Sequence, residues 1–246
     1  MEGTHHDSYT HGHTDHHAHG HKHGTGTRDI CVSVVPIFNH LEDKQMEEIM
    51  EVTRTVSYTK GEIIYRAKEP SDSLYIVNQG KIRIYRLSDS GKEQLVRILH
   101  SGEFTGELAL FNESIHEAYA EAMHETQLCV IKRHDLRELL LKYPSISLKI
   151  LSEFSNRLEQ SEMQTTRFAT EKVETRIALF LAECLDKKER SNEFVLPMSK
   201  KDLASYLGTT PETISRKLSE LEDTGLIKQK ANRIIKIIDL DGLMLI

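Results

Sequence analysis

The sequence has no tryptophan, only three cysteines and no long apolar run. A membrane helix needs about 18 consecutive apolar residues and a secretory signal needs an apolar stretch near the N-terminus, so we expect a cytoplasmic protein without a membrane partner. Three cysteines do not make a disulfide scaffold in a chain of 246 residues, so Cys31, Cys129 and Cys184 point to packing, metal binding or redox chemistry. The net charge of −6 excludes a uniformly basic coat but leaves room for a local basic face.

Residues 1–29 hold nine of the fourteen histidines and almost no aliphatic side chain. Such a segment buries too little apolar surface to offset the conformational entropy lost on ordering, so we predict a disordered tail. Imidazoles suit zinc, nickel and copper, which makes a loose metal site the favoured interpretation and an inert tail the alternative. The candidate ligands are His11, His13, His19, His21 and His23.

Residues 30–144 contain short runs of β-branched and aromatic residues separated by glycines. This pattern is typical of an all-β sandwich or barrel. The expected strands are 73–78, 81–87, 93–99, 118–124 and 127–132. Asp89-Ser-Gly91 is typical of a hairpin turn.

Residues 145–169 form a predicted long helix that follows Pro144. Its apolar and small residues repeat every three or four positions, which favours pairing with a second helix over packing on the barrel as a core helix. The stripe consists of Leu151, Phe154, Leu158, Ser161, Thr165 and Phe168.

Residues 170–246 are predicted to form a small helical domain. A first helix buries Cys184 as an ordinary hydrophobe. Ser199 begins a second helix that stops at Gly208, Thr210 and Pro211 begin a third, and Gly225 ends it. Two short helices joined by such a turn make a helix-turn-helix.

The third helix of this domain has one apolar face and one polar face. On the polar face, Arg216 can bind guanine, Glu212 can accept from cytosine and Ser215 adapts to either role. A surface ion pair between Glu212 and Arg216 is the plainer alternative. A hairpin over 227–238 would form a wing over phosphates through Lys228, Lys230, Arg233 and Lys236. The full set of candidate DNA-binding residues is Lys201, Thr210, Glu212, Ser215, Arg216, Lys217, Ser219 and Arg233.

The order of barrel, long helix and winged helix-turn-helix resembles the CRP/FNR family of bacterial transcription regulators. The residues that carry the resemblance are Gly61-Glu62, Leu74 to Val77 with Gly80, Gly102 to Leu108 and Pro211 to Arg216. The resemblance implies an α+β fold with an N-terminal β-roll (a double-stranded jelly roll like cyclic-nucleotide-binding domains), a dimerisation helix and a C-terminal winged helix. It also implies a homodimer whose recognition helices enter successive major grooves of double-stranded DNA, with RNA polymerase as a further partner. Glu212, Ser215 and Arg216 look like the FNR branch, which suggests a palindrome of TTGAT-type half-sites.

The effector is harder to infer from the resemblance. The cyclic-AMP branch follows its Gly-Glu-Leu, here Gly106-Glu107-Leu108, with an Arg-Ser pair, and His116-Glu117 stands in that place. A carboxylate repels a cyclic phosphate, so cyclic AMP is not expected. Gly106, Glu107 and Leu108 stay candidate effector-pocket residues, and a barrel turn with internal hydrogen bonds is the favoured alternative.

The cysteines suggest another signal. Two thiolates cannot supply the four ligands of an iron–sulfur cluster, so no cluster is expected. The pattern is similar to the FNR-like (Flp) proteins of lactic acid bacteria, which implies a reversible dithiol switch between Cys31 and Cys129. The alternative is that Cys129 is simply buried in the barrel.

Two rival hypotheses remain. A regulator of this type could respond to a small anion through Lys81, Arg83 or Arg97. A cupin-like metalloenzyme is disfavoured because the five histidines outside the tail form no His-x-His pair, so we expect no enzyme.

Overall fold

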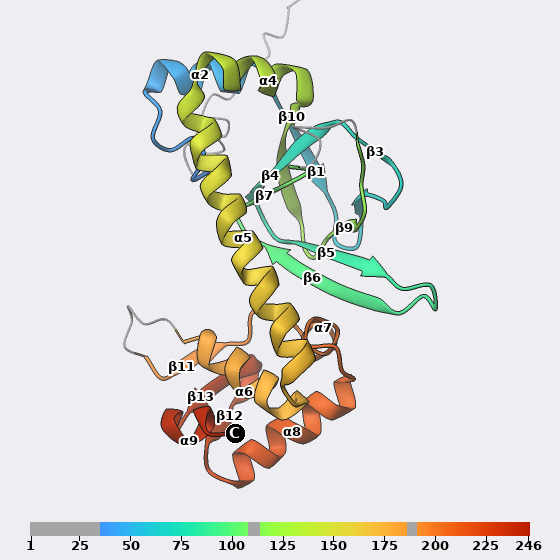
Figure 1. Ribbon diagram of the computed structural model, residues 1–246, viewed down its shortest axis with the longest axis vertical. Helices are drawn as coiled ribbons and strands as arrows, with labels where there is room; N and C mark the ends of the chain where they lie inside the picture. The colour runs from blue at the N-terminus through green and yellow to red at the C-terminus, as the bar shows by residue number, and fades with distance from the viewer. Residues whose placement is uncertain (1–34, 108–113, 186–190) are drawn as a thin grey trace, which may run out of the picture.

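The computed structural model describes residues 35–107, 114–185 and 191–246. Figure 1 shows a β-barrel at one end, a small helical domain at the other and one long helix, α5 (Pro144–Thr170), running between them. The predicted α+β fold, with a β-roll, a long helix and a C-terminal winged helix-turn-helix, is confirmed. Residues 1–29, the predicted histidine-rich tail, lie outside the described residues.

The barrel consists of antiparallel strands in two four-stranded sheets and one two-stranded sheet. The first sheet has the order β1-β10-β4-β7 and contains β1 (Thr53–Tyr58), β4 (Ser73–Gln79), β7 (Phe104–Thr105) and β10 (Thr126–Lys132). The second has the order β2-β9-β5-β6 and contains β2 (Ile63–Tyr65), β5 (Ile82–Leu87), β6 (Glu93–Leu99) and β9 (Tyr119–Ala122). β3 (Pro70–Ser71) pairs with β8 (Ser114–Ile115). The strands expected from glycine-bounded apolar runs are therefore found: 93–99 matches β6 at both ends, and the ends of the others differ by at most two residues.

One hydrophobic cluster joins the barrel to three other parts of the chain. It contains Val35 and Phe38 from the N-terminal segment, Cys129 from β10, and Ile146 and Ile150 from α5, each at most 1% exposed. The helices α2 (Asp43–Glu51) and α4 (Arg133–Lys142) complete it. The start of the long helix is therefore packed on the same core as the N-terminal segment.

The rest of α5 leaves this core. Pro144 stands at the start of the helix, where its missing N–H costs no hydrogen bond. Along the predicted pairing stripe, Leu151 is 56% exposed and Leu158 60% exposed. Large apolar side chains in such positions are available to a second helix.

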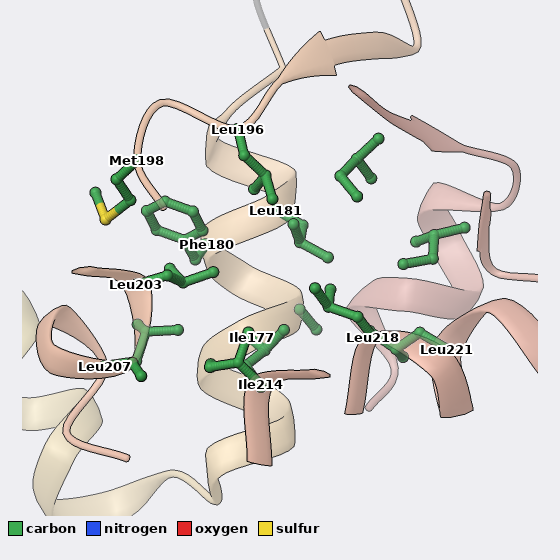
Figure 2. Close-up of a cluster of buried hydrophobic side chains, with 14 of the residues drawn as sticks. Ile177, Phe180, Leu181, Leu196, Met198, Leu203, Leu207, Ile214, Leu218 and Leu221 are labelled. Carbon is green, nitrogen blue, oxygen red and sulfur yellow. The ribbon is translucent and has the colours of Figure 1, made fainter. Parts of the chain in front are cut away.

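The C-terminal domain packs its helices on a three-stranded sheet. The helices are α6 (Val173–Glu183), α7 (Lys200–Tyr206), α8 (Pro211–Asp223) and α9 (Leu240–Met244). The sheet has the order β11-β13-β12, made of β11 (Glu193–Val195), β12 (Ile227–Gln229) and β13 (Ile234–Ile237), with a 3-10 turn at Ala231–Arg233. Figure 2 shows side chains from α6, α7 and α8 meeting in one core, among them Ile177, Leu203 and Ile214. β11, which the sequence analysis did not predict, is the third strand of the wing.

Candidate nucleic-acid interface and barrel cavity

The recognition helix α8 begins and ends where its sequence predicts. The Thr210 side chain accepts a hydrogen bond from the backbone N–H of Thr213 at 3.2 Å, and Pro211 occupies the first turn. Gly208 in the turn before α8 has a φ of +67° and Gly225 after it has a φ of +76°. Both angles lie in the left-handed region that favours glycine. α8 therefore has fixed limits within the helix-turn-helix.

The outer face of α8 is open. The Arg216 side chain is 69% exposed. Glu212 and Ser219 are also exposed and Ser215 is half-buried, while Ile214, Leu218 and Leu221 face the core. Arg216 Nε lies 3.7 Å from a carboxylate oxygen of Glu220, so its partner is Glu220, one turn later. An exposed pair at this distance is weak, and the guanidinium remains accessible to a base edge.

Three of the candidate lysines have internal partners: Lys217, Lys230 and Lys236, whose Nζ lies 3.8 Å from Glu193. Lys217 Nζ lies 2.7 Å from Glu174 on α6 and 2.6 Å from Glu220 on α8, and these hydrogen bonds raise its pKa. In the wing, Lys230 Nζ lies 2.6 Å from Glu193 of β11. These contacts hold α8 and the wing in place. Lys201 and Arg233 are exposed and extend the open surface beyond α8.

The barrel contains a cavity of about 230 Å³, below the roughly 300–1,000 Å³ of most ligand pockets. It is lined on one side by Gly106 and Glu107 and on the other by His116 and Glu117; Leu108 lies outside the described residues. Of the three cations considered for an anion, Arg97 is the one that lines this cavity among the described residues.

The charges of the cavity are already paired. Glu107 Oε1 lies 2.7 Å from Arg97 Nη2 and 2.8 Å from Arg157 Nη1, which comes from α5. Burial raises the pKa of Glu107, but attraction to the two guanidinium groups outweighs it and the pKa lies below its ordinary value. Arg86 Nη2 lies 2.6 Å from Glu117. The two arginines that line the cavity are thus held by its own carboxylates, an arrangement that fits a cyclic phosphate poorly.

His116 is a buried titratable side chain of the cavity. It is 6% exposed and its ring stacks on Tyr65 with centroids 3.7 Å apart. Burial lowers the pKa of His116, so the ring is neutral at neutral pH. Its Nε2 has no hydrogen-bond partner among the described residues.

The cysteines differ in their surroundings. Cys129 on β10 is 1% exposed and disulfide-bonded, whereas Cys184 at the end of α6 is a free thiol. Burial raises the pKa of Cys184 to about 12, so it is a poor nucleophile, as expected for a hydrophobic residue. Cys31, the predicted partner of Cys129, lies outside the described residues, so the pairing stays a prediction.

Comparison with known proteins agrees with this arrangement. The cyclic nucleotide-binding domain family matches residues 55–143 and the Crp-like helix-turn-helix domain family matches residues 175–246. The "Probable transcriptional regulator flp" of Lacticaseibacillus casei is 33% identical over 204 residues, which cover 83% of this chain and 92% of that protein. The chain belongs to the CRP/FNR family.

Other CRP/FNR relatives support the assignment. The "Anaerobic regulatory protein" of Pasteurella multocida is 28% identical over 213 residues, covering 83% of this chain and 77% of that protein. The structure of FixK2 from Bradyrhizobium japonicum is 28% identical with a TM-score of 0.66 and covers 78% of this chain and 96% of that chain. The protein is thus a DNA-binding transcription regulator of the CRP/FNR type, and the resemblance expected from the sequence is confirmed.

The described residues form neither a metal-binding cluster nor a membrane-spanning helix. Within residues 35–107, 114–185 and 191–246, no group of three or more His, Cys, Asp or Glu side chains is placed to hold a metal ion. In the same ranges no helix is both long and apolar enough to cross a membrane. The metal ligands proposed for the tail, His11 to His23, lie outside the described residues.

Sequence reasoning missed the contacts made by two arginines. Arg157 of α5 reaches into the barrel to Glu107, and Arg83, one of three cations considered for an anion site in a rival hypothesis, lies at the contact between the barrel and α7. Their partners are 50 and 119 residues away along the chain. Such separations leave no local pattern from which a contact can be read.

Proposed function

We propose that the protein acts as a homodimer that pairs through the α5 stripe and reads a palindrome of TTGAT-type half-sites. The observation that carries this proposal is the open outer face of α8, with Glu212, Ser215 and Arg216 on one side and a buried apolar face on the other. Glutamate, serine and arginine together can address both members of a G·C pair. The exposed leucines of α5 support pairing of two chains, which would present two such helices to one duplex.

Sedimentation tests the pairing surface separately from DNA. Leu158→Glu places a charge on the stripe, and we expect it to shift the protein from dimer to monomer. Gln160→Glu is the control, because residue 160 lies about 200° around the helix from residue 158 at 100° per residue. Equal dissociation of both variants, or of neither, contradicts pairing through the stripe.

We further propose that the dimer responds to thiol oxidation through Cys31 and Cys129. Cys129 shares its buried cluster with Val35 and Phe38, which follow residue 31 closely in the chain, and with Ile146 and Ile150 of α5. A bond from Cys129 to Cys31 closes a loop of about 100 residues, worth about 4 to 5 kcal/mol in the simple chain model. It would hold the N-terminal segment against the start of the dimerisation helix, so the oxidised form is expected to bind DNA more tightly.

Fluorescence anisotropy with a labelled TTGAT palindrome tests this switch at fixed salt. The wild-type protein is measured reduced, oxidised and with a chelator, beside scrambled DNA. Cys31→Ser and Cys129→Ser should abolish the response to oxidation, whereas Cys184→Ser, at a half-buried free thiol, should keep it. A response that survives in Cys31→Ser excludes the dithiol switch, and a response to the chelator alone makes the histidine-rich tail a zinc, nickel or copper site that regulates binding.

Cyclic AMP and an iron–sulfur cluster are not part of the proposal. The barrel cavity has a volume of about 230 Å³, and it is lined by Glu107 and Glu117, whose carboxylates would repel a phosphate. Two cysteines cannot hold a cluster that takes four thiolates.

A different small effector is the second candidate. Nε2 of His116 and Oε2 of Glu107 are buried without hydrogen-bond partners among the described residues. A ligand could satisfy both atoms, whereas an anion would need a cation that is now paired. A thermal-shift screen of small metabolites with Arg97→Gln as the control variant would identify such a ligand.

A further inference from the structure

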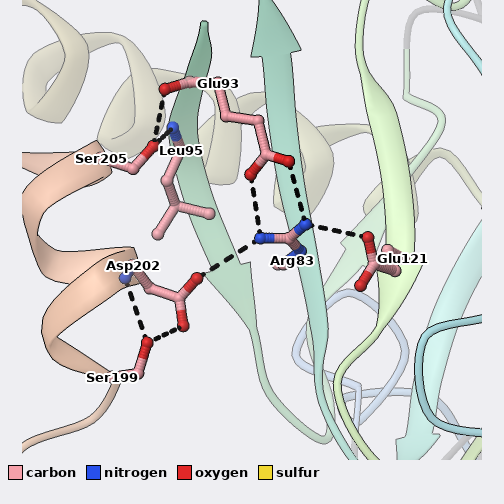
Figure 3. Close-up of polar contacts among 7 residues, drawn as sticks. All are labelled: Arg83, Glu93, Leu95, Glu121, Ser199, Asp202 and Ser205. Carbon is pink, nitrogen blue, oxygen red and sulfur yellow. Dashed lines mark hydrogen bonds and ion pairs between the residues drawn. The ribbon is translucent and has the colours of Figure 1, made fainter.

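The helix-turn-helix rests on the barrel through one edge strand. β6 is the last strand of its sheet, and α7 lies beside it (Figure 3). Ser205 of α7 accepts a hydrogen bond from the Leu95 N–H at 2.7 Å and donates one to the Glu93 carbonyl at 3.0 Å. Leu95 is 1% exposed and belongs to the hydrophobic cluster of the C-terminal domain. A side chain of the helix-turn-helix thus supplies hydrogen-bond partners for backbone groups at the free edge of a barrel strand.

Arg83 of β5 lies next to this contact and joins three carboxylates. Its Nη1 lies 3.2 Å from Glu93 of β6, and its Nη2 lies 2.9 Å from Glu121 of β9. Nη1 also lies 3.4 Å from Asp202 of α7, the partner from the other domain. The Arg83 side chain is 15% exposed and its guanidinium lies 4.6 Å from the centre of the Tyr85 ring. Figure 3 shows the guanidinium between the barrel strands and α7.

Asp202 is itself held within α7. Its Oδ2 accepts a hydrogen bond from Ser199 Oγ at 2.6 Å, and its backbone N–H donates to the same hydroxyl at 3.1 Å. Ser199 is the N-cap of the helix. The carboxylate that meets Arg83 is therefore fixed to the helix axis, and a force on it moves the whole of α7.

We propose that Arg83 is a positioning residue for DNA binding: its guanidinium holds α7 against β6 and so sets the angle of α8 relative to the barrel. α7 and α8 share one core, which contains Leu203, Leu207, Ile214 and Leu218, so they turn together. The barrel is in turn tied to α5 through Glu107 and Arg157. In the dimer proposed above, this chain of contacts sets the spacing of the two recognition helices.

Arg83 differs from an ordinary ion pair because it neutralises several carboxylates at once. Three carboxylates surround one guanidinium, and the side chains of Glu93, Glu121 and Asp202 are 34%, 20% and 13% exposed. Without Arg83, Asp202 faces two like charges in a partly desolvated place, which repels α7 from the barrel. Without the Asp202 charge, Arg83 still has two partners and little repulsion arises. Arg83→Gln should therefore be more disruptive than Asp202→Asn, and adding Asp202→Asn to Arg83→Gln should restore part of the contact.

Hydrogen exchange tests the contact without DNA. The Leu95 amide donates to Ser205, so its exchange rate reports whether α7 lies on β6. We expect Arg83→Gln to speed exchange in residues 93–95 and in α7 by about tenfold or more, with a smaller change in Asp202→Asn and an intermediate one in the double variant. Arg86→Gln is the matched control, because Arg86 lies on the same strand and pairs with the exposed Glu117. Exchange in Arg83→Gln equal to that in Arg86→Gln overturns the proposal.

The spacing of the two half-sites tests the consequence for DNA binding, which rests on the proposed palindrome. Affinities are measured for the palindrome, for palindromes with one base pair added or removed at the centre, and for a single half-site. Arg83→Gln should lose about tenfold in affinity for the parent palindrome and most of the preference for its spacing, with the half-site nearly unchanged. Arg83→Lys should recover part of both.

The two measurements separate two kinds of failure. Faster exchange in Arg83→Gln with an unchanged spacing preference overturns the positioning role. Faster exchange in Arg83→Gln, when even the wild-type protein does not distinguish the palindrome from scrambled DNA, contradicts the proposed operator and supports the Arg83 contact. An equal loss for the palindrome and the half-site also overturns the positioning role, since it indicates a damaged reading face.

Discussion

At the scale of single residues, helix periodicity was enough to find the exposed polar face of α8. Thr210 was predicted as the N-cap, and 100° steps placed Glu212 and Arg216 on the outer face; in the structure Thr210 caps the helix and Glu212 and Arg216 are exposed. Periodicity could not predict that Lys217 reaches Glu174 on another helix, because that contact depends on how α6 and α8 pack. A side chain's face can be derived from sequence, whereas its partner requires the tertiary structure.

Arg216→Ala should weaken binding to one operator by about 1 to 3 kcal/mol and relax the preference at a single base position. The physical reason is the loss of two parallel donors to guanine, with no buried contact disturbed, since the side chain is 69% exposed. Anisotropy with operators substituted at each position measures the effect. Lys201→Gln, at an exposed lysine of α7, serves as the comparison and should weaken all sequences alike, and a uniform loss in Arg216→Ala would reduce Arg216 to a phosphate contact.

His116 should make the barrel less stable as the pH falls. Burial lowers its pKa below the ordinary value of 6.5, so the unfolded chain takes up a proton at a pH where the folded protein does not. Stability is therefore lost as the pH falls from about 6.5 through the lower pKa of the folded state. His116→Phe keeps an aromatic ring on Tyr65 and should flatten this dependence in urea unfolding between about pH 5 and 8. His134→Gln, at a histidine whose side chain is 77% exposed, is the control variant.

At the scale of elements, the helix-turn-helix was predictable because local residues, the helix caps and the glycines, determine where its helices begin and end. Ser199, Gly208, Pro211 and Gly225 mark the ends of α7 and α8 whatever the rest of the chain does. The three-residue strand β11 was missed because Glu193–Val195 is a strand only through its pairing with β13, about forty residues later. Short elements that exist through distant partners carry too little local pattern to be found.

Gly208→Ala should destabilise the protein more than Gly225→Ala. Both glycines have a positive φ, so alanine costs about 1 to 2 kcal/mol at either place. At Gly208 an added Cβ would also lie 3.2 Å from the Phe168 ring of α5, whereas at Gly225 it would meet no atom within 4 Å. The difference between the two unfolding free energies isolates the contact between the long helix and the turn before α8. Equal losses would mean that Phe168 moves aside freely.

At the scale of the whole molecule, the sequence predicted the domains and their order along the chain but not the contacts between them. The long helix was expected to be the link between barrel and DNA-binding domain, and the structure adds a second link at β6 and α7. Arg83 was considered as an anion ligand because a cation on a barrel strand suggests one. Its partner Asp202 lies 119 residues away, so its interdomain role depends on docking, which local patterns do not encode.

The second link predicts that the two domains unfold as one unit. Leu95 belongs to β6 of the barrel but is 1% exposed within the core of the C-terminal domain. Leu95→Ala removes apolar contacts from that core at a cost of about 2 to 5 kcal/mol and should split one calorimetric transition into two. Leu87→Ala, at a leucine that is 44% exposed at the end of β5, is the control and should keep a single transition near the wild-type Tm. If Leu95→Ala lowers the Tm without splitting the transition, the long helix alone suffices to couple the domains. Two transitions already present in the wild-type protein would show that the β6–α7 contact is too weak to make the two domains unfold together.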